Sequence, residues 1–162
     1  MQRIRECHDG LFESAITERV IGAFHAVYDR LGYGFPDSVY QRAMAIEIAK
    51  RGLDARTQPP MEVTYDDVVV GAFRADLVVE SRVVVELASG RSLPPEHERQ
   101  LLNYLKASGL EVGLLFHFGP RPGVKRLVWT SLPRATRQAL IAEPLPEPDP
   151  HPSPRPGACP TP

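Results

Sequence analysis

Two acidic residues, Asp76 and Glu86, lie inside strongly apolar sequence of the kind that forms β-strands. A half-buried carboxylate is costly unless a charge or a hydrogen-bond donor meets it. If residues 80–82 form a three-residue hairpin loop, Val79 pairs with Val83. Asp76 then falls directly opposite Glu86, with both side chains on one face of the sheet. A two-residue loop would instead put the two acids on opposite faces.

A cation between the two acids is one explanation for their positions. Like charges directly across a pair of strands repel each other, so the facing register favours a positive charge between them. Two carboxylates on rigid strands, with the backbone carbonyl of Leu87 nearby, are oxygen ligands that suit Mg²⁺ or Mn²⁺. The alternative is that each acid ends a strand or pairs with a neighbouring arginine, Arg74 or Arg82. The spacing alone leaves both explanations open.

Further polar side chains are expected on a helix that begins at the Pro94-Pro95 pair and ends at Gly109. His97, Gln100 and Tyr104 are three or four residues apart there, so they share one face. This face is either part of a functional site or a polar helix margin with a tyrosine packed on the sheet. The helix is expected to bury an apolar stripe of leucines: Leu101, Leu102 and Leu105.

Two helices are expected before the strands. Apolar residues at steps of three, four and seven predict a first helix from near Ser14, which Gly32 ends. Pro36 and Asp37 suit the first turn of a second helix, because proline loses no hydrogen bond there and a carboxylate meets the positive end of the helix dipole. Asp37 can therefore be an ordinary helix-start acid. The second helix is expected to end at Gly52 and to bury one stripe: Val39, Ala43, Ile46 and Ala49.

After the second helix the spacing of apolar residues changes from a helical to a strand pattern. Alternating or continuous apolar residues predict strands over 61–65, 68–79, 83–87 and 112–118, and a short edge strand over 127–129. Ser131 is expected to cap a last short helix that runs to about Ala142. Helices at both ends of a group of strands, and one between the last two long strands, predict an α/β fold with a mixed sheet flanked by helices.

Length and composition indicate one globular domain. The chain has 162 residues, enough for a single substantial core. We expect an N-terminal arm over residues 1–13, a domain over residues 14–142 and an extended, disordered proline-rich tail over residues 143–162. The tail is also a candidate contact for a protein partner.

Charge and cysteine content limit the classes of protein to which this chain could belong. There are 19 lysines and arginines against 20 acids, a net charge of −1, so binding to DNA or RNA would need a local basic patch. Cys7 and Cys159 lie near opposite ends, where a structural disulfide is not expected. The sequence shows no secretion signal and no long apolar run, which predicts a cytoplasmic protein without a membrane partner.

Several blocks of sequence together resemble the GxxExxY proteins, a bacterial group in the PD-(D/E)XK nuclease superfamily. Residues 31–40 (LGYGFPDSVY) resemble the motif that names the group. Later blocks are similar in order and spacing: 74–79 (RADLVV), 85–87 (VEL), 97–106 (HERQLLNYLK) and 113–119 (GLLFHFG). The resemblance implies a restriction-endonuclease-like fold and a Mg²⁺- or Mn²⁺-dependent phosphodiesterase. It implies that Asp76 and Glu86 bind the metal and that Asp37 assists, with Gln100 and Tyr104 lining the same cleft.

The sequence departs from the family pattern at two positions. Asp37 replaces the glutamate of the named motif and is one methylene shorter. Ala88 replaces the lysine of the E-x-K motif, whose ammonium would position the attacking water and offset charge developing on the phosphate. In the facing register Arg74 lies across from Ala88, but arginine is common at that place in the family even where the lysine is present, so Arg74 is not a migrated replacement. Arg91 and Lys106 are further candidates to replace the lysine, both weaker on geometry.

The missing lysine leaves two main functions open. One is a metal-dependent nuclease that acts on DNA or RNA. The other is a catalytically inactive nuclease fold that binds nucleic acid or a protein partner. A structural protein that kept only the fold is a weaker third option.

Overall fold

A computed structural model of the protein describes residues 13–130, which fall within one compact unit. The helix expected over 131–142 and the proline-rich tail lie outside the described residues, as does the arm apart from Glu13. Among the helices described, none is both long enough and apolar enough to span a membrane.

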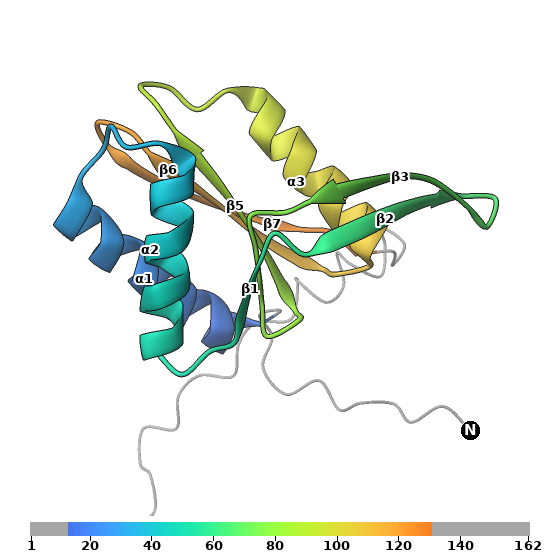
Figure 1. The fold of residues 1–162 in the computed structure, drawn as a ribbon, viewed down its shortest axis with the longest axis horizontal. Coiled ribbons are helices and arrows are strands. Elements are labelled where there is room, and N and C mark those ends of the chain that lie inside the picture. The colour runs from blue at the N-terminus through green and yellow to red at the C-terminus, as the bar shows by residue number, and fades with distance from the viewer. Residues whose placement is uncertain (1–12, 131–162) are drawn as a thin grey trace, which may run out of the picture. The chain divides into compact units, whose positions relative to one another are not determined.

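The main sheet has five strands and confirms the expected mixed α/β architecture (Figure 1). In spatial order its strands are β1 (Ala55–Thr57), β4 (Leu77–Val79), β5 (Val83–Ser89), β6 (Val112–Phe118) and β7 (Pro122–Val128). Only β5 and β6 are parallel, and the other neighbours are antiparallel. The parallel pair needs a crossover connection, which the third helix supplies.

Helices cover both faces of this sheet (Figure 1). The helices within residues 13–130 are α1 (Ser14–Leu31), α2 (Asp37–Lys50) and α3 (Pro95–Ser108). Val83, Val85 and Leu87 of β5 pack in the core with α1 and α2, whereas Val84 and Ala88 pack in a second core with α3. Because side chains alternate along a strand, Glu86 points to the α3 face.

A separate two-stranded ribbon projects beside α3 (Figure 1). It consists of β2 (Pro60–Tyr65) and β3 (Val68–Arg74), joined at Asp66 and Asp67, which both have positive φ. The apolar run over 68–79 is thus not one strand, because the chain leaves the ribbon at Ala75 and enters the main sheet at Leu77. Strand β1 was not expected from the sequence, and β7 is longer than the expected strand over 127–129.

The predicted buried stripe of α2 is wrong by about one residue. Ile46 is 58% exposed and Val39 is also exposed. The buried residues of α2 are instead four apart: Tyr40, Met44 and Ile48. The sequence analysis left Tyr40 out of the stripe, but its ring stacks on Phe118 at 3.9 Å and its hydroxyl donates a hydrogen bond to the carbonyl of Gly32. A tyrosine that satisfies its hydroxyl in this way can be fully buried.

This correction gives a direct stability test within one helix. We expect Met44→Ala to lower the free energy of unfolding by about 2 to 5 kcal/mol, because it removes a fully buried side chain and leaves a cavity. Ile46→Ala is the matched control, with an expected change within about 0.5 kcal/mol. Urea unfolding of both variants measures the difference. The opposite ranking would contradict the packing of α2.

Candidate active site

The two central acids lie where β4 begins beside the middle of β5. The expected three-residue loop and the pairing of Val79 with Val83 are confirmed. The ladder runs as far as the pair of Leu77 with Val85, and continuing the same register by one residue places Asp76 opposite Glu86. Asp76 itself precedes β4 rather than lying inside it.

Glu86 is held in an environment that disfavours its charge. Its side chain is on a central strand and the residue is only 6% exposed. Burial raises the pKa of Glu86 from 4.5 to about 8, and the negative charge of Asp76 adds to this effect. Among the described residues, Glu86 Oε2 is buried without a hydrogen-bond partner. This oxygen therefore lacks the compensation that a buried acid normally requires.

Asp76 is half-buried and held by two neighbours. The backbone N–H of Leu87 donates to its Oδ2 at 2.8 Å, and Gln41 Nε2 donates to its Oδ1 at 3.2 Å. Burial nevertheless raises the pKa of Asp76, which the hydrogen bond from Leu87 opposes. The N–H and carbonyl of one strand residue point to the same side, so the Leu87 carbonyl also points toward the Asp76 side of β5.

Helix α2 brings two polar residues to the acids. Asp37, in its first turn, is exposed, and its negative charge helps to raise the pKa values of both Asp76 and Glu86. Gln41 lies one turn later and also donates to the backbone carbonyl of Asp76 at 3.1 Å. Gln41 was not among the predicted site residues, although its spacing of four from Asp37 places the two on one face.

Helix α3 contributes Tyr104 and Gln100 to the surroundings of the two acids. Tyr104 is buried, and its ring stacks on Phe73 of the ribbon with centroids 4.2 Å apart. Burial raises the pKa of Tyr104, and the charges of Glu86 and Asp76 add to this, which places the tyrosine near both acids. Gln100 Nε2 hydrogen-bonds the Tyr104 hydroxyl.

His97 is a further polar side chain at this face. Its positive charge would lower the pKa of Asp76, and its Nδ1 is buried without a hydrogen-bond partner in the part of the chain described. The spacing predicts that His97 shares a face with Gln100 and Tyr104 but indicates no separate role for it. Its proximity to Asp76 depends on how α3 packs, which the sequence did not reveal.

The position expected to hold lysine is fully buried beneath α3. Ala88 packs with Leu101, Tyr104 and neighbouring apolar residues. The prediction that Arg74 lies across from Ala88 is wrong, because the β4–β5 ladder does not extend that far. Arg74 belongs to the ribbon, where it pairs with Pro60 and donates to the carbonyl of Gln58 at 2.9 Å.

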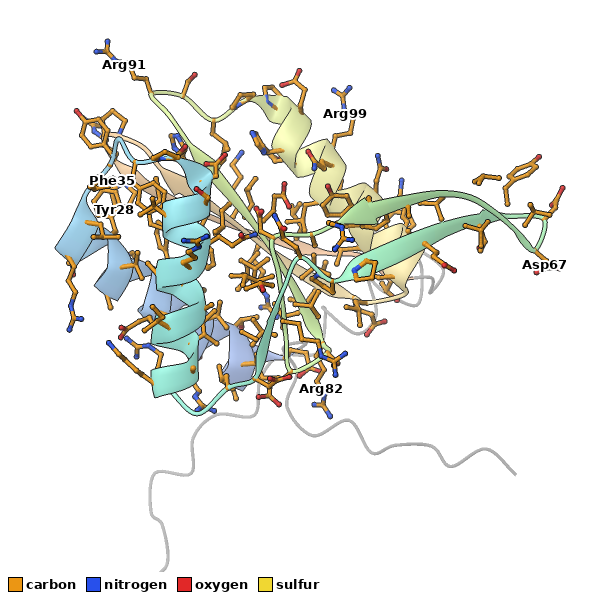
Figure 2. All side chains as sticks on the ribbon, in the orientation of Figure 1. Tyr28, Phe35, Asp67, Arg82, Arg91 and Arg99 are labelled. Atoms are coloured by element: carbon orange, nitrogen blue, oxygen red, sulfur yellow. The ribbon has the colours of Figure 1, made fainter. Side chains whose placement is uncertain are left out.

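The other two cations considered for this role lie elsewhere. The Lys106 ammonium is 4.6 Å from the centroid of the Trp129 ring. Arg91 is exposed on the loop after β5, at the end of the molecule that also carries Phe35 (Figure 2).

The donor set fits a divalent cation only in part. Over residues 13–130, no three His, Cys, Asp or Glu side chains lie close enough to form a metal site on their own. Two opposed carboxylates remain, and within residues 13–130 one carboxylate oxygen of Glu86 has no hydrogen-bond partner. Oxygen ligands of this kind suit Mg²⁺ or Mn²⁺, which commonly complete their coordination with water and substrate phosphate.

A hollow of about 300 Å³ lies away from these acids. Its lining includes Arg56 of β1, Met61 of β2 and Ser108 at the C-terminal end of α3. It contains neither Asp76 nor Glu86, so we place the candidate chemistry at the acids.

Comparison with known proteins gives a family match over most of the chain. Residues 14–127 match the family model described as the PD-(D/E)XK nuclease superfamily. Two solved structures are similar: that of SSO0001 (TM-score 0.44, 22% identity, 80% of this chain) and an alkaline exonuclease (LHK-Exo) from Laribacter hongkongensis (TM-score 0.45, 11% identity, 65% of this chain). The matches cover 65% and 60% of those chains, so this chain spans less than two thirds of either. No curated protein matches the sequence.

Proposed function

Because this chain belongs to the PD-(D/E)XK nuclease superfamily, we propose that it is a metal-dependent nuclease of the GxxExxY type. Its substrate is DNA or RNA, and its chemistry is hydrolysis of a phosphodiester bond. Asp76 and Glu86 carry the site, with Asp37, Gln41, Gln100 and Tyr104 around them.

One observation carries this proposal. Glu86 is buried opposite a second carboxylate, one of its oxygens has no partner in the described part of the chain, and its pKa is raised to about 8. A fold gains nothing from this arrangement on its own, because a buried acid beside a like charge is destabilising. A divalent cation would relieve both the repulsion and the missing partner.

The residues that would hold the cation are Asp76, Glu86 and the backbone carbonyl of Leu87. When bound, Mg²⁺ or Mn²⁺ would supply Lewis acidity that activates water and neutralises the leaving oxygen. Gln41 and the Leu87 N–H fix the orientation of Asp76 through their hydrogen bonds. Tyr104, which receives a hydrogen bond from Gln100, supports the site from α3.

His97 is the side chain we propose to act in place of the missing lysine. It lies close enough to influence Asp76 electrostatically, and its Nδ1 is buried without a partner among the described residues. An imidazole can accept a proton from water near neutral pH, which an arginine cannot do. A general base must lie within hydrogen-bond reach of the attacking water, directly or through one further water.

The alanine at position 88 favours the second candidate function, a nuclease fold that binds nucleic acid without cutting it. An alanine here cannot position water or offset charge on the phosphate. The two candidates differ in chemistry and not in fold, so cleavage decides between them.

The deciding experiment is cleavage by the purified full chain. We expect cleavage of DNA or RNA with Mn²⁺ present and loss of cleavage when EDTA is added. Glu86→Gln should lower the rate at least about 10²-fold, because it removes a ligand charge while keeping the shape of the side chain. Glu62→Gln, on the ribbon, is the matched control and should cut at the wild-type rate. Cleavage that survives both EDTA and Glu86→Gln would exclude this site as its source.

A further inference from the structure

Three loops meet at the carboxyl ends of the parallel strands β5 and β6, and we call them the rim: residues 32–36, 90–94 and 119–121. The strands end together, with Ser89 paired to Phe118, and the N–H of Gly90 donates to the carbonyl of Phe118. Tyr28 of α1 fixes the third loop, since its hydroxyl donates to the carbonyl of Gly119 at 2.8 Å. Ligands of open α/β sheets bind at such carboxyl ends.

The first rim loop is held rigidly by a buried tyrosine. The Tyr40 hydroxyl accepts a hydrogen bond from the N–H of Phe35 at 3.1 Å and donates one to the carbonyl of Gly32. Its ring stacks on Phe118, which ties this loop to the end of β6. Gly32 and Gly34 have positive φ values of 65° and 110°, a conformation that other residues rarely adopt.

This rigid loop displays two aromatic rings. Tyr33 is 54% exposed and Phe35 is 46% exposed. Phe35 makes a T-shaped contact with Tyr40, with ring centroids 6.2 Å apart, so part of its surface is anchored while the rest faces solvent. Asp37 follows directly on Pro36, so the aromatic loop runs straight into the acid site.

The rim is also basic, in a chain whose net charge is −1. Arg91 and Arg121 are both exposed on rim loops, and the three rim segments contain no aspartate or glutamate. No ion pair within residues 13–130 involves either arginine. Arg91 and Phe35 lie at one end of the molecule, whereas Arg82 lies at the other (Figure 2).

We propose that the rim binds single-stranded nucleic acid, with unpaired bases stacked on Tyr33 and Phe35 and phosphates near Arg91 and Arg121. Rigid exposed rings next to cationic side chains are the combination that binds single strands without sequence preference. A paired base offers no free face to these rings, so a duplex is a poorer ligand. This inference rests on the proposed function and extends it, because it names the form of nucleic acid delivered to Asp76 and Glu86.

The test measures binding in EDTA, so that no cleavage intervenes. Fluorescence anisotropy compares labelled oligo(dT), oligo(U) and a duplex of equal length on the full chain. We expect single strands to bind at least about tenfold more tightly than the duplex. Tyr33→Ala combined with Phe35→Leu should weaken single-strand binding about 10- to 100-fold, since each stacked base amounts to about a factor of ten. Phe35→Leu keeps apolar contact with Tyr40, so the loop retains its anchor.

Matched controls separate the rim from general surface effects. Tyr65→Ala removes a ring that is 70% exposed on the distant ribbon and should leave binding unchanged. For a single strand, each phosphate contact contributes about 0.7 to the slope of log Kd against log salt concentration. The double variant Arg91→Gln, Arg121→Gln should therefore lower this slope by about 1.4. Arg82→Gln should leave the slope unchanged. Equal binding of the duplex, or unchanged binding by the ring variants, overturns the rim proposal.

Cleavage of the same oligonucleotides with Mn²⁺ is measured separately. Rim-dependent binding without cleavage supports the rim and overturns the proposed nuclease. Wild-type cleavage without any effect of the rim variants supports the nuclease and overturns the rim.

Discussion

Ala88→Lys is expected to raise metal-dependent cleavage by about 10²- to 10³-fold, the effect of one positioned donor on a developing oxyanion. Residue 88 lies two positions after Glu86 on β5, so a lysine there shares its face. Its ammonium could then reach the phosphate that Asp76 and Glu86 are proposed to bind. Steady-state cleavage of DNA and RNA with Mg²⁺ or Mn²⁺ measures the change.

Two controls make this result specific. Ala88→Met adds a side chain of similar length without charge, so it tests whether any gain comes from repacking under α3. Glu86→Gln in the Ala88→Lys background should abolish the gain, because the added ammonium acts only with the metal in place. Absence of cleavage in both the wild type and Ala88→Lys, with folding verified, would favour the binding-only function.

The same substitution tests the role proposed for His97. His97→Gln should lower wild-type cleavage, and Ala88→Lys should restore it if the two side chains perform one task. His25→Gln is the control, because His25 is exposed on α1 and outside the site. A His97→Gln variant that cuts at the wild-type rate would remove His97 from the mechanism.

The second large effect concerns stability and pH. The pKa of Glu86 is about 8 in the folded protein and near 4.5 when the side chain is free. Between these values the folded protein keeps a proton that the unfolded chain releases, so stability falls as pH rises from about 4.5 to about 8. The pKa difference bounds this loss at about 5 kcal/mol. We therefore expect Glu86→Gln to raise the melting temperature by several degrees at pH 8 and to change it little at pH 5.

A divalent cation bound at Glu86 should offset the loss of stability that ionisation of this side chain causes. Because a cation bound at Glu86 would have to displace its proton, we expect Mn²⁺ to raise the melting temperature of the wild type more at pH 8 than at pH 6. Differential scanning fluorimetry with and without EDTA measures this without reference to activity. Glu86→Gln should abolish the metal effect, while Glu62→Gln should retain it. A stabilisation by Mn²⁺ that is equal in both variants would place the cation elsewhere.

Much of the fold could be predicted because its signals are local. The first helix begins at Ser14 and β6 spans 112–118, as the periodicity predicts. Gly32 and Gly109 end α1 and α3 with positive φ, the conformation that suits glycine after a helix. The loop over 80–82 fixes the register of β4 and β5, and that register rests on adjacent residues alone.

The remaining features depend on contacts that sequence periodicity does not encode. The run over 68–79 is apolar throughout, so nothing in it signals that the chain changes sheets at Ala75. The partner of β4 on its other side is β1, a three-residue strand with no apolar pattern. Gln41 meets Asp76 across 35 residues of sequence, and His97 approaches the same acid only through the packing of α3.

The ribbon of β2 and β3 has a consequence for solubility. Neither of its outer edges pairs with another strand in the part of the chain that the structure describes. Val68, Val69 and Val70 are all exposed there, and such an open, apolar edge is a template for strand pairing between molecules. Asp66 and Asp67 form the turn between β2 and β3, and Figure 2 shows Asp67 at the tip of the ribbon, where like charges would repel a second copy. We therefore expect these two acids to oppose aggregation, whereas Asp76 and Glu86 are proposed to bind a cation.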